Sequence, residues 1–154
     1  MLDHYIEWAK TKDADVFISF HINSSVSGAA QGAEVYYPQG EENAQELAKD
    51  IVGELAKLGL KNRGDKGDDS YAVIRHSKRN GFPGLIIEHA FVSNVSDAKW
   101  FQTEENLKKL GAHIYLYEGN HEVSMEFLSN TIESYKGIAE DREKIDELMF
   151  SAEE

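Results

Sequence analysis

Two short apolar runs in this sequence each end on a side chain that can do chemistry. Residues 16–20 are followed by His21, and residues 84–87 are followed by Glu88. Short runs of apolar, β-branched and aromatic residues bounded by polar ones are typical of buried strands. Ligands of open α/β sheets bind beside the carboxyl ends of such strands. A neutral imidazole and a carboxylate at two strand ends are parts that a metal-dependent hydrolase needs.

The composition narrows the kind of site that this chain can build. Its 154 residues include no cysteine, so a bound metal must use His, Asp or Glu. A cysteine nucleophile is excluded, and no Gly-x-Ser-x-Gly turn indicates a serine hydrolase. The net charge of −12 argues against nucleic acid or an anionic membrane surface as a partner. No apolar run approaches the roughly 20 residues that span a bilayer, so membrane insertion is not expected.

Strand and helix patterns alternate along the chain around these two residues. Strand patterns occupy four segments: residues 16–20, 32–37, 71–75 and 84–88. Helical spacing occupies three segments: residues 2–9, residues 44–58 and a stretch that begins near residue 103. A charged loop is expected between the second helix and the third strand, at residues 61–70. The pattern predicts an α/β fold with a mostly parallel, twisted sheet flanked by helices.

The composition changes near the end of the chain. Residues 122–154 contain ten acidic and three basic residues, interspersed with apolar positions. The apolar positions favour one or two amphipathic helices, packed on the domain or on a partner, over a disordered acidic tail. We therefore predict an α/β catalytic domain over residues 1–119 and an acidic, amphipathic helical extension over residues 120–154.

Five segments of the chain carry a family resemblance. They read ADVFISFHIN at residues 14–23, GAEVYY at 32–37, LGLKNRG at 58–64 with Lys66, YAVIR at 71–75 and PGLIIEHAFVSN at 83–94. In the same order, they resemble the ADLFISIHAN, GxEVYY, LGLKxRGxK, LYVLR and PAVLVELGFLSN motifs of zinc-dependent N-acetylmuramoyl-L-alanine amidases of the amidase-3 family. The resemblance covers roughly residues 5–118.

The resemblance implies hydrolysis of the amide bond between N-acetylmuramic acid and L-alanine in peptidoglycan. It implies that His21 is a zinc ligand and Glu88 the general acid and base that moves the proton of the attacking water. Asn23 follows His21 by two residues, on the same side of a continuing strand, and would support the site. Arg75 ends a predicted strand and would either neutralise Glu88 or hold a substrate carboxylate. His89 stands where the family usually has Leu. It would support the site by tuning the pKa of Glu88 or by taking part in metal binding, or it is a packing or hydrogen-bonding residue.

The family's zinc site has three protein ligands, and this sequence matches only one of them. The other two are a histidine in a GHGG loop and a glutamate on the following helix, and both precede the matched region. We therefore expect an N-terminally truncated amidase-3-like domain with an incomplete zinc site and impaired activity. The alternative is a non-catalytic amidase-like domain that binds cell-wall material or another protein.

Two further expectations follow from the resemblance. A sheet that lacks its first strand would expose backbone and apolar surface, which predicts self-association through the exposed edge. Peptidoglycan as a partner implies an extracytoplasmic or cell-wall location. The first residues, however, lack the basic start and apolar stretch of a signal peptide.

Overall fold

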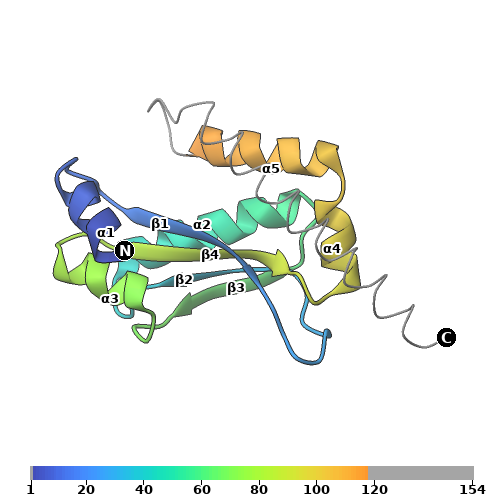
Figure 1. Cartoon of the computed structure of the whole chain (residues 1–154), viewed down its shortest axis with the longest axis horizontal. Coiled ribbons are helices and arrows are strands. Elements are labelled where there is room, and N and C mark those ends of the chain that lie inside the picture. Colours follow the sequence, from blue (N-terminus) through green and yellow to red (C-terminus); the bar gives the residue numbers. More distant parts are fainter. Residues whose placement is uncertain (1, 118–154) are drawn as a thin grey trace.

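The computed structural model describes residues 2–117 and consists of one four-stranded sheet with helices packed against it (Figure 1). In chain order the elements are α1 (Leu2–Lys10), β1 (Phe17–Asn23), β2 (Ala33–Tyr37), α2 (Glu42–Lys57), β3 (Asn62–Gly67), α3 (Ala72–Arg79), β4 (Gly84–Phe91), α4 (Val95–Phe101) and α5 (Glu104–Tyr117). The predicted α/β class is confirmed. The predicted acidic extension lies outside the described residues. Among residues 2–117, no helix is both long enough and apolar enough to cross a membrane.

The sheet is mixed, with the strand order β1–β4–β2–β3. β1 pairs parallel with β4, and β2 pairs parallel with β3, whereas β2 and β4 run antiparallel. The two outer pairs therefore have the predicted parallel arrangement, and the central pair does not. Because β2 and β4 run in opposite directions, the beginning of β2 lies beside the end of β4. This places β2 next to the predicted site.

The clearest predicted helix is confirmed as α2. It ends at Lys57 with Leu58 as its C-cap, and Gly59 follows with a φ of 100°, a left-handed conformation that glycine adopts without steric cost. Its apolar stripe is buried against the sheet: Ala44, Ala48, Ile51, Val52 and Leu55. α2 contacts β2, β3 and β4 and therefore anchors one face of the sheet.

The two faces of the sheet have different environments, because alternate residues of a strand point to opposite faces. One face packs into the main core with α2 and α5, and its strand residues include Ile18, Phe20, Val35, Leu85 and Ile87. On the opposite face, Phe17 at the start of β1 packs in a smaller cluster with residues of α1. Gly84 at the start of β4 lies against Ser77 of α3. Farther along this second face, the strands carry polar side chains.

Three segments differ from the predictions. Residues 71–75, predicted as a strand, belong mostly to α3, because so short an apolar run does not distinguish a strand from a helix. Residues 61–70, predicted as a loop, contain β3, whose charged side chains suit the edge of a sheet. β1 was predicted to be buried, but it is the other edge strand, and each of its residues is partly or largely exposed.

Candidate active site

A row of three polar residues crosses the sheet where the sequence predicts the site. The β1–β4 register pairs His21 with Glu88, and the β4–β2 register pairs Glu88 with Glu34. Side chains of directly paired residues lie on the same face, with Cβ atoms about 5 Å apart. The sheet therefore brings His21 and Glu88 together, although 66 positions separate them in the sequence. Glu34, which our sequence analysis did not propose, lies on the other side of Glu88.

Glu88 is the carboxyl best suited to exchange a proton. Its side chain is half-buried, and its Oε2 atom is buried without a hydrogen-bond partner in the described part of the chain. Burial, and then the negative charge of Glu34, raise the pKa of Glu88 from its ordinary 4.5 to about 7. A carboxyl with a pKa near neutrality can serve as general acid and general base under the same conditions.

His21 and His89 lie close together but face in opposite directions. His21 is exposed, with its Nε2 atom 2.7 Å from the hydroxyl of Ser19. His89 is 1 % exposed, stacks on Phe20, and donates from Nδ1 to the backbone carbonyl of His21 over 3.1 Å. Burial lowers the pKa of His89 to about 4, so its ring is neutral at pH 7. His89 thus packs behind the β1 backbone, while His21 faces the open side.

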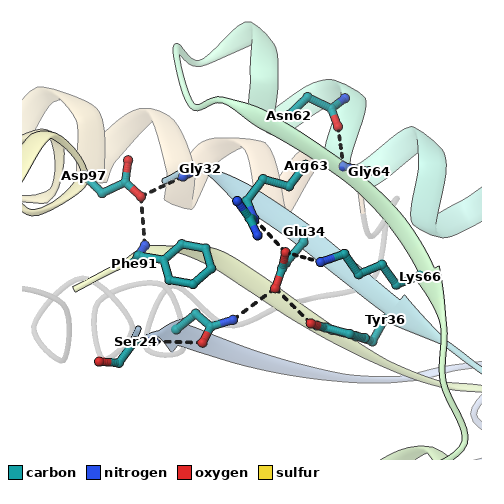
Figure 2. A network of polar contacts seen from close by, with 11 residues as sticks. Ser24, Gly32, Glu34, Tyr36, Asn62, Arg63, Gly64, Lys66, Phe91 and Asp97 are labelled. Atoms are coloured by element: carbon teal, nitrogen blue, oxygen red, sulfur yellow. Dashed lines mark hydrogen bonds and ion pairs between the residues drawn. The ribbon is translucent and has the colours of Figure 1, made fainter. Parts of the chain in front are cut away.

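Glu34 is the centre of a buried polar network (Figure 2). It is 2 % exposed, and its Oε1 atom accepts from the Asn23 amide at 3.1 Å and the Tyr36 hydroxyl at 2.9 Å. Its Oε2 atom accepts from Arg63 Nε at 2.7 Å and Lys66 Nζ at 2.5 Å. Burial alone would raise the pKa of Glu34, but the hydrogen bonds from the two cations and the tyrosine lower it below its ordinary value. Glu34 is therefore ionised at neutral pH, in contrast to Glu88.

A bulge in β4 changes which side chains share the face of Glu88. Between His21 and Asn23 the partner position on β4 advances from Glu88 to Phe91, so β4 contains one extra residue there. A bulge interrupts the alternation of side chains, and bulges are frequent beside active sites. The Arg63 guanidinium carbon lies 4.8 Å from the centre of the Phe91 ring, so Phe91 reaches the same polar network.

A second bulge directs a cation into the network. Between the pairings of Asn62 and Asp65, β3 advances three residues while β2 advances two. Gly64 lies in this bulge with a φ of 89°, and its amide donates to the Asn62 side chain at 2.7 Å. Arg63 precedes Gly64 and reaches across the sheet to Glu34 (Figure 2).

A second buried carboxylate, Asp97, holds the backbone beside the site. Asp97 is 3 % exposed, and its Oδ2 atom accepts from the amides of Gly32 and Phe91, both at 2.8 Å (Figure 2). Gly32 directly precedes β2, and Phe91 ends β4. Asp97 therefore ties together the ends of the two strands that carry Glu34 and Glu88.

Arg75 does not lie where the sequence analysis expected it. It is part of α3 rather than the end of a strand, and its guanidinium donates to the backbone carbonyls of Asp69 and Ser70. The cations beside the polar row are instead Arg63 and Lys66, both from β3. One feature of the sequence could have indicated this network. Glu34 is an isolated charge in the apolar strand Ala-Glu-Val-Tyr-Tyr, and a buried carboxylate requires cations from elsewhere in the chain.

The described residues do not complete a zinc centre. Among residues 2–111, whose side chains the structure describes, no group of three or more His, Asp or Glu side chains is placed to hold a metal ion. Glu34 already uses both carboxylate oxygens in hydrogen bonds, which leaves His21 and Glu88. Catalytic zinc takes three protein ligands and a water molecule. The donor set in this part of the chain is therefore too small for zinc.

The fold and the polar row define an α/β domain with a buried carboxyl, Glu88, on a central strand of its sheet. The sequence profile of the Amidase_3 family, described as N-acetylmuramoyl-L-alanine amidase, matches residues 1–117. The chain belongs to this family, as its motifs predicted.

Individual relatives agree with the family assignment. The chain is 36 % identical over 111 residues to the uncharacterized protein YqiI of Bacillus subtilis. This alignment covers 70 % of this chain and 52 % of YqiI. It is 37 % identical over 100 residues to the N-acetylmuramoyl-L-alanine amidase LytC of the same organism, and this alignment covers 63 % of this chain and 19 % of LytC. The CwlD amidase of Clostridioides difficile, solved in complex with the GerS lipoprotein, aligns with a TM-score of 0.65 and 29 % identity over 75 % of this chain and 58 % of CwlD. The chain thus spans about half or less of the two Bacillus proteins.

Proposed function

We propose that this chain carries the acid–base part of a cell-wall amidase that cleaves the amide between N-acetylmuramic acid and L-alanine of peptidoglycan. Ionised Glu88 would take a proton from the water that attacks the amide carbon, and then deliver it to the leaving nitrogen. The observation that supports this proposal is the buried, unpartnered Oε2 of Glu88, on a carboxyl with a pKa of about 7. His21, paired with Glu88 in the sheet, would lie beside the reacting amide.

For His21, we propose the role of one zinc ligand, from its match to the family motif. The described side chains offer no complete set of ligands, so the remaining ones would lie outside residues 2–111. We therefore expect zinc binding by this chain to be weak and its amidase activity to be impaired. Asn23 supports the site in this proposal, because it holds Glu34 beside Glu88.

A non-catalytic role is the second candidate. The absence of a three-ligand group among the described side chains, those of residues 2–111, favours it, because an amidase-like fold without zinc keeps its surface but loses its chemistry. In that case the chain would bind cell-wall material or another protein. Peptidoglycan remains the expected partner of either form, with a location outside the cytoplasmic membrane or in the wall.

Self-association is a separate proposal that rests on the edge strand β1. Among the described strands, β1 has a sheet neighbour on one side only, and its apolar residues Ile18 and Phe20 are only partly buried. An open edge of this kind can pair with a second chain. Sedimentation velocity should therefore show a concentration-dependent dimer, and a monodisperse monomer at all concentrations would contradict the proposal.

Zinc content and amide cleavage, measured on the same preparations, test the proposed function. The protein would be purified without chelators or affinity metals and compared with His21→Ala, Glu88→Gln and the control His4→Ala, an exposed residue of α1. Cleavage is measured as new L-alanine amino termini released from peptidoglycan. A functional amidase would lose zinc in His21→Ala only. It would also lose activity by about 10²–10⁴-fold in Glu88→Gln, the usual contribution of a general acid–base.

The opposite result is equally informative. Negligible zinc in every preparation, with no cleavage but retained binding to insoluble peptidoglycan, would favour the non-catalytic role. If Glu88→Gln cleaved peptidoglycan at the rate of the wild type, the acid–base assignment would be refuted.

A further inference from the structure

We propose that Arg63 and Lys66 form a subsite for a carboxylate of the peptide stem, next to the amide that Glu88 serves. The inference rests on the proposed function, because it assumes that a muramoyl peptide lies on this face of the sheet. It adds a substrate contact that the acid–base proposal does not require.

The charge balance of the network is the first argument. Arg63 and Lys66 both pair with the same oxygen of Glu34, and no second carboxylate in the described part of the chain lies within ion-pair distance of either cation. One cation would suffice to neutralise one buried carboxylate. Arg63, Lys66 and Glu34 together carry a net charge of +1. The network therefore has one positive charge available for another anion.

The accessibility of the two cations is the second argument. The side chains of Arg63 and Lys66 are 28 % and 37 % exposed, whereas that of Glu34 is 3 % exposed. The cations thus lie between the buried carboxylate and solvent. Arg63 donates to Glu34 through Nε, and no other carboxylate in the described part of the chain forms an ion pair with its guanidinium. A guanidinium in this state can bind a ligand carboxylate through two parallel hydrogen bonds.

Aromatic rings hold both cations in place. Arg63 lies over the ring of Phe91, and the Lys66 Nζ atom lies 5.4 Å from the centre of the Tyr36 ring. The Tyr36 ring is in turn 4.8 Å from that of Tyr71. Such cation–π contacts restrict the long side chains before a ligand arrives, which lowers the entropy lost on binding.

The spacing selects the residue whose carboxylate would bind. Glu34 and Glu88 are on adjacent strands, about 5 Å apart, and the cation head groups lie a few Å beyond Glu34. An extended peptide advances by roughly 3.5 Å per residue. A carboxylate on the second residue after the cleaved amide therefore reaches Arg63 and Lys66 when the amide lies at Glu88.

Nuclear magnetic resonance titration of the ¹⁵N-labelled chain tests this subsite without requiring catalysis. The probes are an N-acetylmuramoyl dipeptide with a free terminal carboxylate, the same dipeptide with a terminal carboxamide, and inorganic phosphate. The amide signals of Gly64 and Gly67 on β3 report binding. The wild type is compared with Lys66→Met, Lys66→Arg and the control Lys78→Met, a cation of similar exposure on α3. Lys66→Met leaves Arg63 paired with Glu34, so the buried carboxylate stays compensated.

We expect the wild type to bind the carboxylate about tenfold more tightly than the carboxamide, as for one charge-assisted contact. This preference should disappear in Lys66→Met and persist in Lys66→Arg and Lys78→Met. Equal binding of the two dipeptides would overturn the subsite and leave the proposed function standing. Binding of neither dipeptide would overturn both. Equal affinity for phosphate and for the carboxylate dipeptide would overturn the assignment to the peptide stem.

Discussion

The environment of Glu88 leads to a sharp prediction about the stability of the Glu88→Gln variant. Glutamine resembles the protonated carboxyl in shape and carries no charge at any pH. Because folding raises the pKa of Glu88 from 4.5 to about 7, the protonated carboxyl stabilises the fold fully below about pH 4.5. That stability is lost as the pH rises through about 7, when the buried carboxyl must ionise beside Glu34. Glu88→Gln does not lose it, so the variant should become more stable than the wild type at high pH.

The magnitude follows from the pKa interval. At about 1.4 kcal/mol per pH unit, the interval from 4.5 to about 7 corresponds to roughly 3 kcal/mol. Glu88 is only half-buried, and solvent screening reduces the expected value to about 2 kcal/mol. At pH 5 the wild type and the variant should differ little. At pH 8 the free energy of unfolding should be about 2 kcal/mol higher for Glu88→Gln.

Urea denaturation followed by circular dichroism, at pH 5 and pH 8 with a chelator present, measures this difference. The matched control is Glu46→Gln, which removes an exposed carboxylate from α2 without touching the site. A difference between wild type and Glu88→Gln that does not change with pH would refute the argument. So would an equal gain in the control, because the effect would then reflect net charge alone.

Two other predictions concern the backbone that supports the site, and thermal or urea denaturation measures both. Asp97→Ala should lower the free energy of unfolding by about 2–4 kcal/mol, because it leaves the buried amides of Gly32 and Phe91 without their acceptor; a loss below 0.5 kcal/mol would show that Asp97 is not a clamp. Gly64→Ala should cost only about 1–2 kcal/mol, since its φ is 89° but a Cβ would meet no atom within 4 Å. Gly32→Ala should cost more, because a Cβ there would also lie 2.0 Å from the carbonyl oxygen of Lys61. Equal costs for the two glycines would contradict the role of that close contact.

Local patterns in the sequence were sufficient for several elements. The apolar stripe of α2 and the strands around Val35 and Ile87 repeat with the period of a helix or a strand, so neighbouring residues alone predict them. The motifs around His21 and Glu88 predicted that these residues share a site, and the β1–β4 register pairs them. Their chemical roles remain proposals.

The sequence was least informative where an element is short or at a sheet edge. Residues 71–75 have too few apolar positions to separate a strand from the helix α3. β3 is charged, and β1 is apolar but partly exposed, because each has a neighbour on one side only. Strand order decides which strands are edges, and strand order depends on contacts between distant segments.

The sequence by itself determined the family, the α/β class and the candidate residues His21 and Glu88, because these depend on local motifs and periodicity. It placed both residues at strand ends, whereas β1 continues to Asn23 and β4 to Phe91. Only the tertiary structure decided the chemistry around them. The antiparallel pairing of β2 with β4 places Glu34 against Glu88, and a bulge in β3 brings Arg63 to Glu34. These contacts join residues that lie far apart in the sequence. The raised pKa of Glu88 results first from burial and then from the charge of Glu34 on the neighbouring strand, and no local pattern contains either.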